Sequence, residues 1–273
     1  HNALALYYNY LQSLPCLGLT CYTFVALLKA CAKLQDFVGG SHIHAEVARM
    51  GFLESDYYVG SSLICMYGEC GFLGKAQEVF HELPLRDVSS WTALISGYVE
   101  HGFDDLALSC FKLMRNEGLS PDAVTFTCVL KACGNKGSLE IGEEIYAEVQ
   151  KQGLLAKNMV LSNALLDMYV KCGSLARAQE TFEALPVKNV ISWTVLIMGY
   201  AQQGFGDKAM TFFQQMVNDG LSPDGVTFIC ILKACGSHGL VNMGREIHAS
   251  ANRLGLLEKD VVLSTALLDM YAK

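Results

Sequence analysis

The sequence predicts an all-α solenoid built from stacked two-helix repeat units. The string Leu-Lys-Ala-Cys occurs three times, at 28–31, 130–133 and 232–235, with a spacing of 102 residues. Trp91 and Trp193 stand the same distance apart. A fixed period marks a repeat architecture, in which each unit buries apolar surface against its neighbours. No window alternates polar and apolar residues in a sustained way, so no sheet is expected.

Each period divides into repeat units of 36, 31 and 35 residues. The expected 36-residue units are 21–56, 123–158 and 225–260, the 31-residue units are 57–87 and 159–189, and the 35-residue units are 88–122 and 190–224. The ends, 1–20 and 261–273, are interpreted as partial units of 35-residue and 31-residue type. Together these repeat units are expected to form one continuous solenoid.

Two helices are expected in every repeat unit, as 190–224 illustrates. Trp193 and Ile197 share one helical face. Gly204 ends that helix, because glycine is favoured just past a helix C-terminus. A second helix is expected from about 207 to 217, before Gly and Pro turn the chain into the next repeat unit.

Composition narrows the class of protein. At 52% hydrophobic and 17% charged residues, the chain is too apolar for disorder. Gly, Lys or Asp interrupts every apolar run, so no membrane-spanning helix is expected. The 11 cysteines are odd in number and mostly recur with the period, which predicts reduced packing residues rather than disulfides. The net charge of −7 disfavours nucleic acid, although binding depends on where the charges lie.

Three recurring strings carry a family resemblance. The 35-residue units contain Ser-Trp-Thr-Ala-Leu-Ile-Ser-Gly-Tyr at 90–98, the 36-residue units contain Val-Thr-Phe before Leu-Lys-Ala-Cys, and the 31-residue units contain Ala-Leu-Leu-Asp-Met-Tyr before Lys-Cys-Gly. With these lengths in rotation, the chain resembles the plant pentatricopeptide repeats in their P, L and S arrangement, the organellar RNA-editing type. The resemblance spans essentially the whole chain. A tetratricopeptide array differs in its uniform 34-residue period and its Trp and Pro pattern.

The resemblance implies a right-handed α-solenoid that binds single-stranded RNA, with one base read per repeat unit by two or three side chains. In the family, the fifth and last residues of a unit read one base, and the second residues of adjacent units sandwich it. The resemblance also implies a mitochondrial or chloroplast protein that recognises a cis-element for C-to-U editing or RNA processing.

Comparison of the repeat units with one another supports the fifth residue as a base-reading position. The almost identical strings at 159–171 and 261–273 carry Asn163 and Thr265 at their fifth position. A position that varies inside a constant packing frame is expected to face outward, where a base code could be written. The predicted base-reading residues are Ser61 with Asp87, Thr92 with Asp122, Thr127 with Asn158, Asn163 with Asn189, Thr194 with Asp224, and Thr265.

Two further sets follow from the same alignment. The predicted base-sandwiching residues, at the second position, are Tyr22, Tyr58, Val124, Val160, Ile191, Val226 and Val262. Lysines one or two helical turns from a reading position are candidate phosphate contacts. These are Lys29, Lys33, Lys131, Lys171 and Lys233.

The pairs give a partial target. Thr with Asp resembles the guanine-selecting pair, because guanine offers hydrogen-bond donors at N1 and N2. Asn163 with Asn189 resembles the pyrimidine-selecting pair, cytosine ahead of uracil. The predicted register, from 5′ to 3′, is N-G-G-(A)-(C/U)-G-N, with no base assigned where the fifth residue is Val25 or Ile229.

No enzyme activity, cofactor or metal site is expected. A zinc deaminase needs His-x-Glu and Cys-x-x-Cys. His44-Ala45-Glu46 fits the first half, but no two cysteines are three residues apart. Any deaminase domain of the whole protein would lie outside this chain.

An alternative function is a protein-binding solenoid that docks editing partners and has little RNA affinity of its own. The acidic net charge and the apolar fifth residues favour this alternative function.

The partial repeat units at the two ends are expected to expose apolar residues such as Leu4, Leu6, Leu267 and Met270. Exposed apolar ends of a repeat array also predict end-to-end self-association. No membrane partner is expected.

Overall fold

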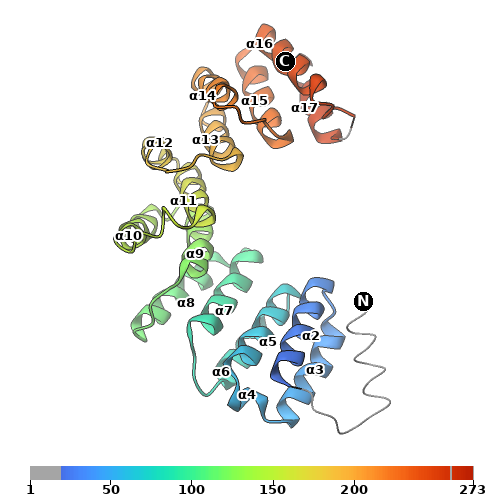
Figure 1. Ribbon diagram of the computed structural model, residues 1–273, viewed down its shortest axis with the longest axis vertical. Coiled ribbons are helices and arrows are strands. Elements are labelled where there is room, and N and C mark those ends of the chain that lie inside the picture. The colour runs from blue at the N-terminus through green and yellow to red at the C-terminus, as the bar shows by residue number, and fades with distance from the viewer. Residues whose placement is uncertain (1–19, 259, 273) are drawn as a thin grey trace. The chain divides into compact units, whose positions relative to one another are not determined.

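The computed structural model describes residues 20–258 and 260–272, so the expected partial unit at 1–20 lies almost wholly outside the described residues. The chain divides into two compact bodies, residues through 132 and residues from 133 onward, and the division falls inside α9 (Ala123–Lys136). Helices make up the described part of the chain, which contains no strand (Figure 1). This agrees with the predicted all-α class.

The N-terminal body is built from helix pairs that precede α9. Its helices are α2 (Cys21–Leu34), α3 (Phe37–Arg49), α4 (Phe52–Ser55), α5 (Tyr57–Glu69), α6 (Leu73–Glu82), α7 (Val88–Glu100) and α8 (Asp104–Asn116). The first helices α2, α5 and α7 contact one another in series, whereas α3, α6 and α8 pack on their own partners. The result is two layers, which we call the first-helix layer and the second-helix layer (Figure 1).

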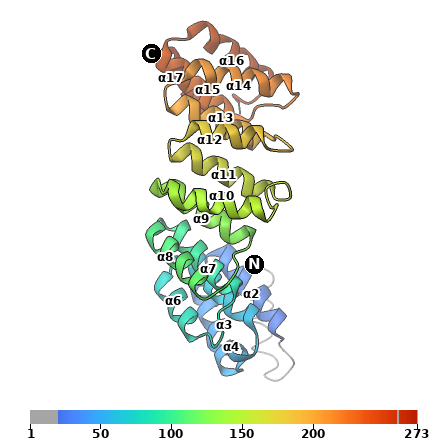
Figure 2. The same cartoon turned by 90° about the vertical axis from the view of Figure 1, so that its left-hand side faces the viewer.

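The C-terminal body repeats this arrangement. Its helices after α9 are α10 (Leu139–Lys151), α11 (Met159–Lys171), α12 (Leu175–Glu183), α13 (Val190–Gln202), α14 (Gly206–Asn218), α15 (Gly225–His238), α16 (Val241–Arg253) and α17 (Val261–Ala272). Here α11, α13, α15 and α17 contact in series, and the even-numbered helices form the second layer (Figure 2).

Every described first helix starts at the first residue of an expected repeat unit, and from α5 onward the side chain of the residue before it caps the helix. Asp87 and Asn189 accept hydrogen bonds from the N–H groups of Ser90 and Ser192, both at 2.8 Å. A capping Asp or Asn satisfies an N–H group that would otherwise lack a partner at the helix start. The last residues Asp56, Asp122, Asn158, Asp224 and Asp260 cap their helices in the same way.

The recurring Cys-Gly pair ends the first helix of the 31-residue units. Gly71 and Gly173 have φ of 80° and 79°, in the left-handed region that favours glycine. After each glycine, the N–H of the next residue reaches back to the carbonyl of Tyr67 or Tyr169, at 2.9 Å in both cases. These glycines therefore turn the chain toward the second helix.

The periodic residues quoted from the sequence form the core between the two layers. Trp91 packs edge-on against Phe80, with ring centroids 4.5 Å apart, and Trp193 packs in the same way against Phe182 at 4.6 Å. Such aromatic pairs add about 0.5–1.5 kcal/mol beyond the area they bury. The repeated tryptophan thus joins each 35-residue unit to the second helix of the unit before it.

The cysteines of the three Leu-Lys-Ala-Cys strings are also core residues. Cys31, Cys133 and Cys235 are at most 1% exposed, whereas the lysine of each string is exposed. All cysteines that the structure describes are free thiols. Their repeat-equivalent burial agrees with the predicted packing role.

These thiols are expected to react slowly. Burial raises the pKa of Cys31 and of Cys235 to about 11. Near pH 8 this lowers their thiolate fraction about a hundredfold relative to an ordinary thiol. We expect iodoacetamide to alkylate both at least about tenfold more slowly in the native protein than in guanidinium chloride, as followed by peptide mass spectrometry. Equal rates in the two conditions would contradict this assignment.

One expectation about the C-terminal half-unit is wrong. Leu267 and Met270 are 6% and 3% exposed, not open to solvent, and Leu4 and Leu6 lie outside the described residues. Met270 is buried because its thioether packs beside Gly244, where the β-carbon of any other residue would clash with the Met270 sulfur. Leu268, by contrast, is 71% exposed, and Val261, Val262 and Tyr271 of α17 are also exposed. Among the described residues, no helix has the length and apolar character needed to cross a membrane.

Candidate nucleic-acid interface

A groove on the first-helix layer of the N-terminal body brings together predicted site residues from successive repeat units. We call it the reading groove, and its volume is about 600 Å³. The predicted residues that line it are Lys29, Lys33, Tyr58, Ser61, Thr92, Asp122 and Val124. Val25, Cys65 and Ser89 also line it. Candidates for phosphate contact, base reading and base stacking therefore share one surface.

A second groove lies on the first-helix layer of the C-terminal body, with a volume of about 480 Å³. Its lining includes Val226, Ile229 and Lys233, one from each predicted class of position. The remaining predicted residues line neither groove. These are Tyr22, Asp87, Thr127, Lys131, Asn158, Val160, Asn163, Lys171, Asn189, Ile191, Thr194, Asp224, Val262 and Thr265.

The predicted base-sandwiching residues are all exposed apolar side chains. Their exposed fractions range from 55% for Val226 to 81% for Tyr22. Two residues after Val124 and Val226, by contrast, Phe126 and Phe228 are at most 1% exposed. One exposed apolar residue is ordinary, but recurrence at one position of the repeat needs a reason that core packing does not supply.

The fifth residues depart from the expectation that they face outward. Thr92 and Thr194 are only 9% and 7% exposed, whereas Thr265 is exposed and Asn163 is half-buried. The reason is a short hydrogen bond from each buried threonine to a residue of the next repeat unit. Thr92 Oγ1 lies 2.6 Å from Thr125 Oγ1, and Thr194 Oγ1 lies 2.6 Å from Thr227 Oγ1.

A second hydrogen bond joins each of these next-unit threonines to the last residue of the unit that contains Thr92 or Thr194. The Thr125 hydroxyl donates to Asp122 Oδ1 at 2.8 Å, and the Thr227 hydroxyl donates to Asp224 Oδ1 at 2.7 Å. Fifth and last residues are thereby joined through a third side chain. Sequence reasoning missed Thr125 and Thr227, although both stand in the recurring Val-Thr-Phe string.

Capping determines which atom each last residue offers to a ligand. Asp122 and Asp224 use Oδ1 for the cap, which leaves Oδ2 as an additional acceptor. Asn158 and Asn189 also cap through Oδ1, so the amide orientation is set and Nδ2 is the other polar atom. Capping aspartates thus present an acceptor, and capping asparagines present a donor.

The fifth residue Asn163 has a hydrogen-bond acceptor, its Oδ1 atom, in the same repeat unit as the Asn189 donor. Its Oδ1 is buried and has no hydrogen-bond partner among the residues that the structure describes. Buried polar atoms are rarely left without a partner, and those that are call for an explanation. Asn163 Oδ1 is therefore an unsatisfied acceptor, which a bound donor could reach only after the side chain turns toward solvent.

The candidate phosphate contacts differ in their surroundings. Lys29, Lys33, Lys131 and Lys233 are exposed. Lys171 is also exposed but forms an ion pair with Asp167 on the same helix, with 2.7 Å between Nζ and Oδ2. That pair lowers the positive charge which Lys171 offers to a phosphate.

No metal site accompanies these residues. In the part of the chain that the structure describes, no group of three or more His, Cys, Asp or Glu side chains could hold a metal ion. His44 Nδ1 lies 2.9 Å from the Tyr67 hydroxyl, and His248 has the same relation to Tyr271 at 3.0 Å. Burial lowers the pKa of His44. This repeated His–Tyr contact accounts for His44 as a packing residue.

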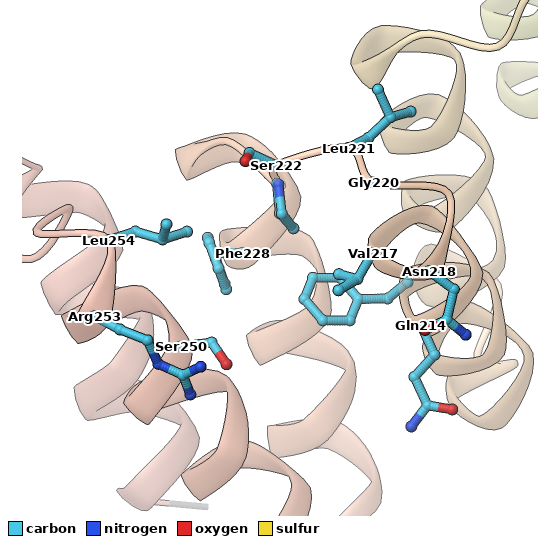
Figure 3. A pocket seen from close by; sticks show the side chains of 12 residues that line it. Gln214, Val217, Asn218, Gly220, Leu221, Ser222, Phe228, Ser250, Arg253 and Leu254 are labelled. Atoms are coloured by element: carbon cyan, nitrogen blue, oxygen red, sulfur yellow. The ribbon is translucent and has the colours of Figure 1, made fainter.

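A separate pocket of about 380 Å³ lies among α14, α15 and α16 (Figure 3). Val217, Phe228 and Leu254 give it an apolar lining from three helices, and Arg253 lies at its side. No predicted base-reading residue lines this pocket.

Comparison with protein families decides which family has this architecture. The PPR repeat family model matches residues 86–135 and 188–237, and the PPR repeat model matches 61–88, 124–154 and 160–190. Together these matches cover more than half of the chain. The chain belongs to the pentatricopeptide repeat (PPR) family.

Similar proteins support the assignment. The chain is 35% identical over 252 residues to the chloroplastic pentatricopeptide repeat-containing protein At1g15510 of Arabidopsis thaliana, covering 92% of this chain and 29% of that protein. It is 34% identical over 273 residues to the mitochondrial protein At1g06140 of the same plant, covering 100% of this chain and 48% of that protein. The chain thus spans less than half the length of these relatives.

A solved structure confirms the α-solenoid class. The crystal structure of maize PPR10 matches 98% of this chain and 39% of its own, with a TM-score of 0.66 and 20% sequence identity. At that identity the similarity concerns the fold.

Proposed function

We propose that this PPR array binds single-stranded RNA and reads its sequence, one base per repeat unit. The observation that carries the proposal is the reading groove, where lysines, an exposed aromatic ring and paired polar residues meet. Lys29 and Lys33 are suited to phosphates, and Tyr58 is suited to the face of a base. PPR repeats are one of the modules that read RNA in this way.

The polar atoms match particular base edges. Asp122 Oδ2 and Thr92 Oγ1 are acceptors, which suit the adjacent N1–H and N2–H donors of guanine. Asn189 Nδ2 donates one hydrogen to the Met159 sulfur and has a second to offer, and Asn163 would offer Oδ1 as an acceptor after its side chain turns out of its buried position. That combination suits cytosine, which has an N4 amino group beside acceptors at N3 and O2. The proposed register is accordingly N-G-G-(A)-(C/U)-G-N.

The names of the relatives also bear on the compartment and the biological role of this protein. The relatives reported above are named chloroplastic or mitochondrial. We propose that this protein acts in one of these organelles, as a PPR protein of the P, L and S subclass. Its target would be a cis-element for C-to-U editing or RNA processing, with the chemistry supplied outside this chain. Editing-complex proteins are the proposed further partners.

A direct test compares RNA binding with and without the guanines. An RNA containing 5′-GGACG-3′ is compared with one in which the second and last guanines become adenine, by fluorescence anisotropy at low and moderate salt. We expect a preference of about tenfold or more for the first RNA. Asp122→Asn with Asp224→Asn should abolish or reverse it, because each replaces the acceptor Oδ2 by a donor and keeps the cap.

The matched control is Asp260→Asn. Asp260 also caps a helix through Oδ1, but its repeat unit has an apolar fifth residue and no assigned base. This variant should leave the guanine preference within about twofold. Equal binding of both RNAs by the unmodified chain would refute base reading.

The apolar pocket of Figure 3 favours a second candidate function, the docking of a partner protein. No predicted base-reading residue lines it, although Pro223 in its lining directly precedes Asp224. Undetectable RNA binding in the same experiment would favour protein docking as the main role.

A further inference from the structure

We infer that Thr125 and Thr227 are positioning residues that make the fifth-position threonines selective for guanine. The inference rests on the proposed RNA-reading function and extends it to side chains of the following repeat unit. Both threonines are the third residue of their unit, and both are fully buried. They are therefore out of direct reach of a base.

The first step concerns what each threonine joins. Thr125 Oγ1 lies 2.6 Å from Thr92 Oγ1, within hydrogen-bond distance. The Thr125 hydroxyl also donates a hydrogen bond to Asp122 Oδ1, at 2.8 Å. The N–H of Thr125 donates to Asp122 Oδ1 as well, at 2.8 Å. Two donors from one residue thus hold the carboxylate, and the hydroxyl links it to Thr92. The reading pair is held as one hydrogen-bonded group.

The second step is a count of hydrogens. A hydroxyl has one hydrogen to donate, and an ionised carboxylate has none. Thr125 uses its hydrogen on Asp122, so Thr92 must donate to Thr125. The Thr92 oxygen can then only accept a hydrogen bond from RNA. It suits a base that presents donors, as guanine does at N1 and N2, and it disfavours the N1 acceptor of adenine.

The C-terminal body repeats the arrangement. The single hydrogen of the Thr194 hydroxyl has two acceptors within reach, Thr227 Oγ1 at 2.6 Å and the Val190 carbonyl at 2.8 Å. Thr227 donates to Asp224 Oδ1 at 2.7 Å. The Thr194 hydrogen is therefore used inside the protein, and its oxygen is an acceptor toward a ligand.

The other repeat units whose fifth and last residues the structure describes lack this link. In the unit 57–87, the last residue Asp87 is followed by Ser90 as third residue of the next unit, but the Ser90 hydroxyl donates to the Asp87 carbonyl at 2.9 Å. Ser61, the fifth residue, instead donates to the Tyr58 carbonyl at 3.2 Å. The Ser61 oxygen is thus also an acceptor, but no side chain holds it together with Asp87 as one group. Because the two threonines are held in this way, we expect the guanines that they read to be selected more strictly than the guanine read by Ser61.

The test uses Thr125→Val and Thr227→Val, which keep the side-chain shape and the backbone cap but remove the hydroxyl. Thr125→Val should lower the guanine-over-adenine preference at the second guanine by about fivefold or more. It should leave the preference at the last guanine and at the pyrimidine within about twofold. Thr227→Val should affect the last guanine alone, and Thr125→Ser should retain the selectivity at the second guanine.

The outcomes separate this inference from the proposed function. If the unmodified chain discriminates guanine and Thr125→Val retains that discrimination within about twofold, the positioning role is overturned and RNA reading stands. If the unmodified chain shows no base preference, both fail. If circular dichroism shows that the valine variants do not fold, the unmodified chain still tests the inference. Equal discrimination against adenine at the first and second guanines overturns it. Stricter discrimination at the second guanine supports it.

Discussion

Phe228→Ala is expected to lower the free energy of unfolding of the C-terminal body by about 3–5 kcal/mol. The Phe228 ring is 1% exposed and packs edge-on against Phe213, with centroids 5.8 Å apart. Its removal leaves a cavity where the second helix of one repeat unit meets the first helix of the next. Hydrogen exchange of amides in α15, compared between variant and unmodified chain, measures the loss at the site itself.

The matched control lies two residues away on the same helix. Val226 is 55% exposed, so Val226→Ala should change the same free energy by less than about 0.5 kcal/mol. If Val226 sandwiches a base, this variant should still weaken RNA binding. Comparable destabilisation by both variants would mean that the exposed position has a packing role, and would remove the reason to assign it to RNA.

Tyr58→Ala is expected to weaken RNA binding by about 1–3 kcal/mol, or roughly fivefold to 150-fold, because a stacked base loses its aromatic partner. Tyr58 is 69% exposed and lines the reading groove. The change can be measured by titrating a labelled 5′-GGACG-3′ RNA. Its effect should be nearly independent of base identity, since every base has a face to stack.

Tyr57→Ala is the control for this prediction. Tyr57 is the neighbouring residue, is 53% exposed, and does not line the groove. It should leave the affinity within about twofold. Equal losses for the two tyrosines would point to a general effect on α5, and no loss for Tyr58 would argue against stacking in the reading groove.

Local chemistry explains why so much of the fold could be predicted. The capping Asp or Asn and the glycine past each helix act within a few residues of their own position, so their spacing shows where helices start and end. Gly71 with its left-handed φ and Asp87 with its cap hydrogen bond are examples. The same period assigned Trp91 and Cys31 to the core, where the structure has them.

The site was harder to predict because exposure depends on neighbouring helices. Thr92 and Thr194 look like outward-facing positions along their own helices, yet Thr125 and Thr227, each 33 residues further on, bury them. Met270 is covered because Gly244 leaves room for its side chain. Lys171 has the spacing of a phosphate contact, but its ion pair with Asp167 uses part of its charge.

The sequence by itself thus determined the helical class, the repeat period and the family, because these follow from short-range patterns repeated along the chain. Only the tertiary structure decided which polar atoms are available to a ligand. That depends on side chains supplied by the next repeat unit: the cap uses one oxygen of Asp122, and Thr125 uses the hydrogen of Thr92. The contact between Thr92 and Thr125 joins residues 33 positions apart, beyond the reach of any local pattern.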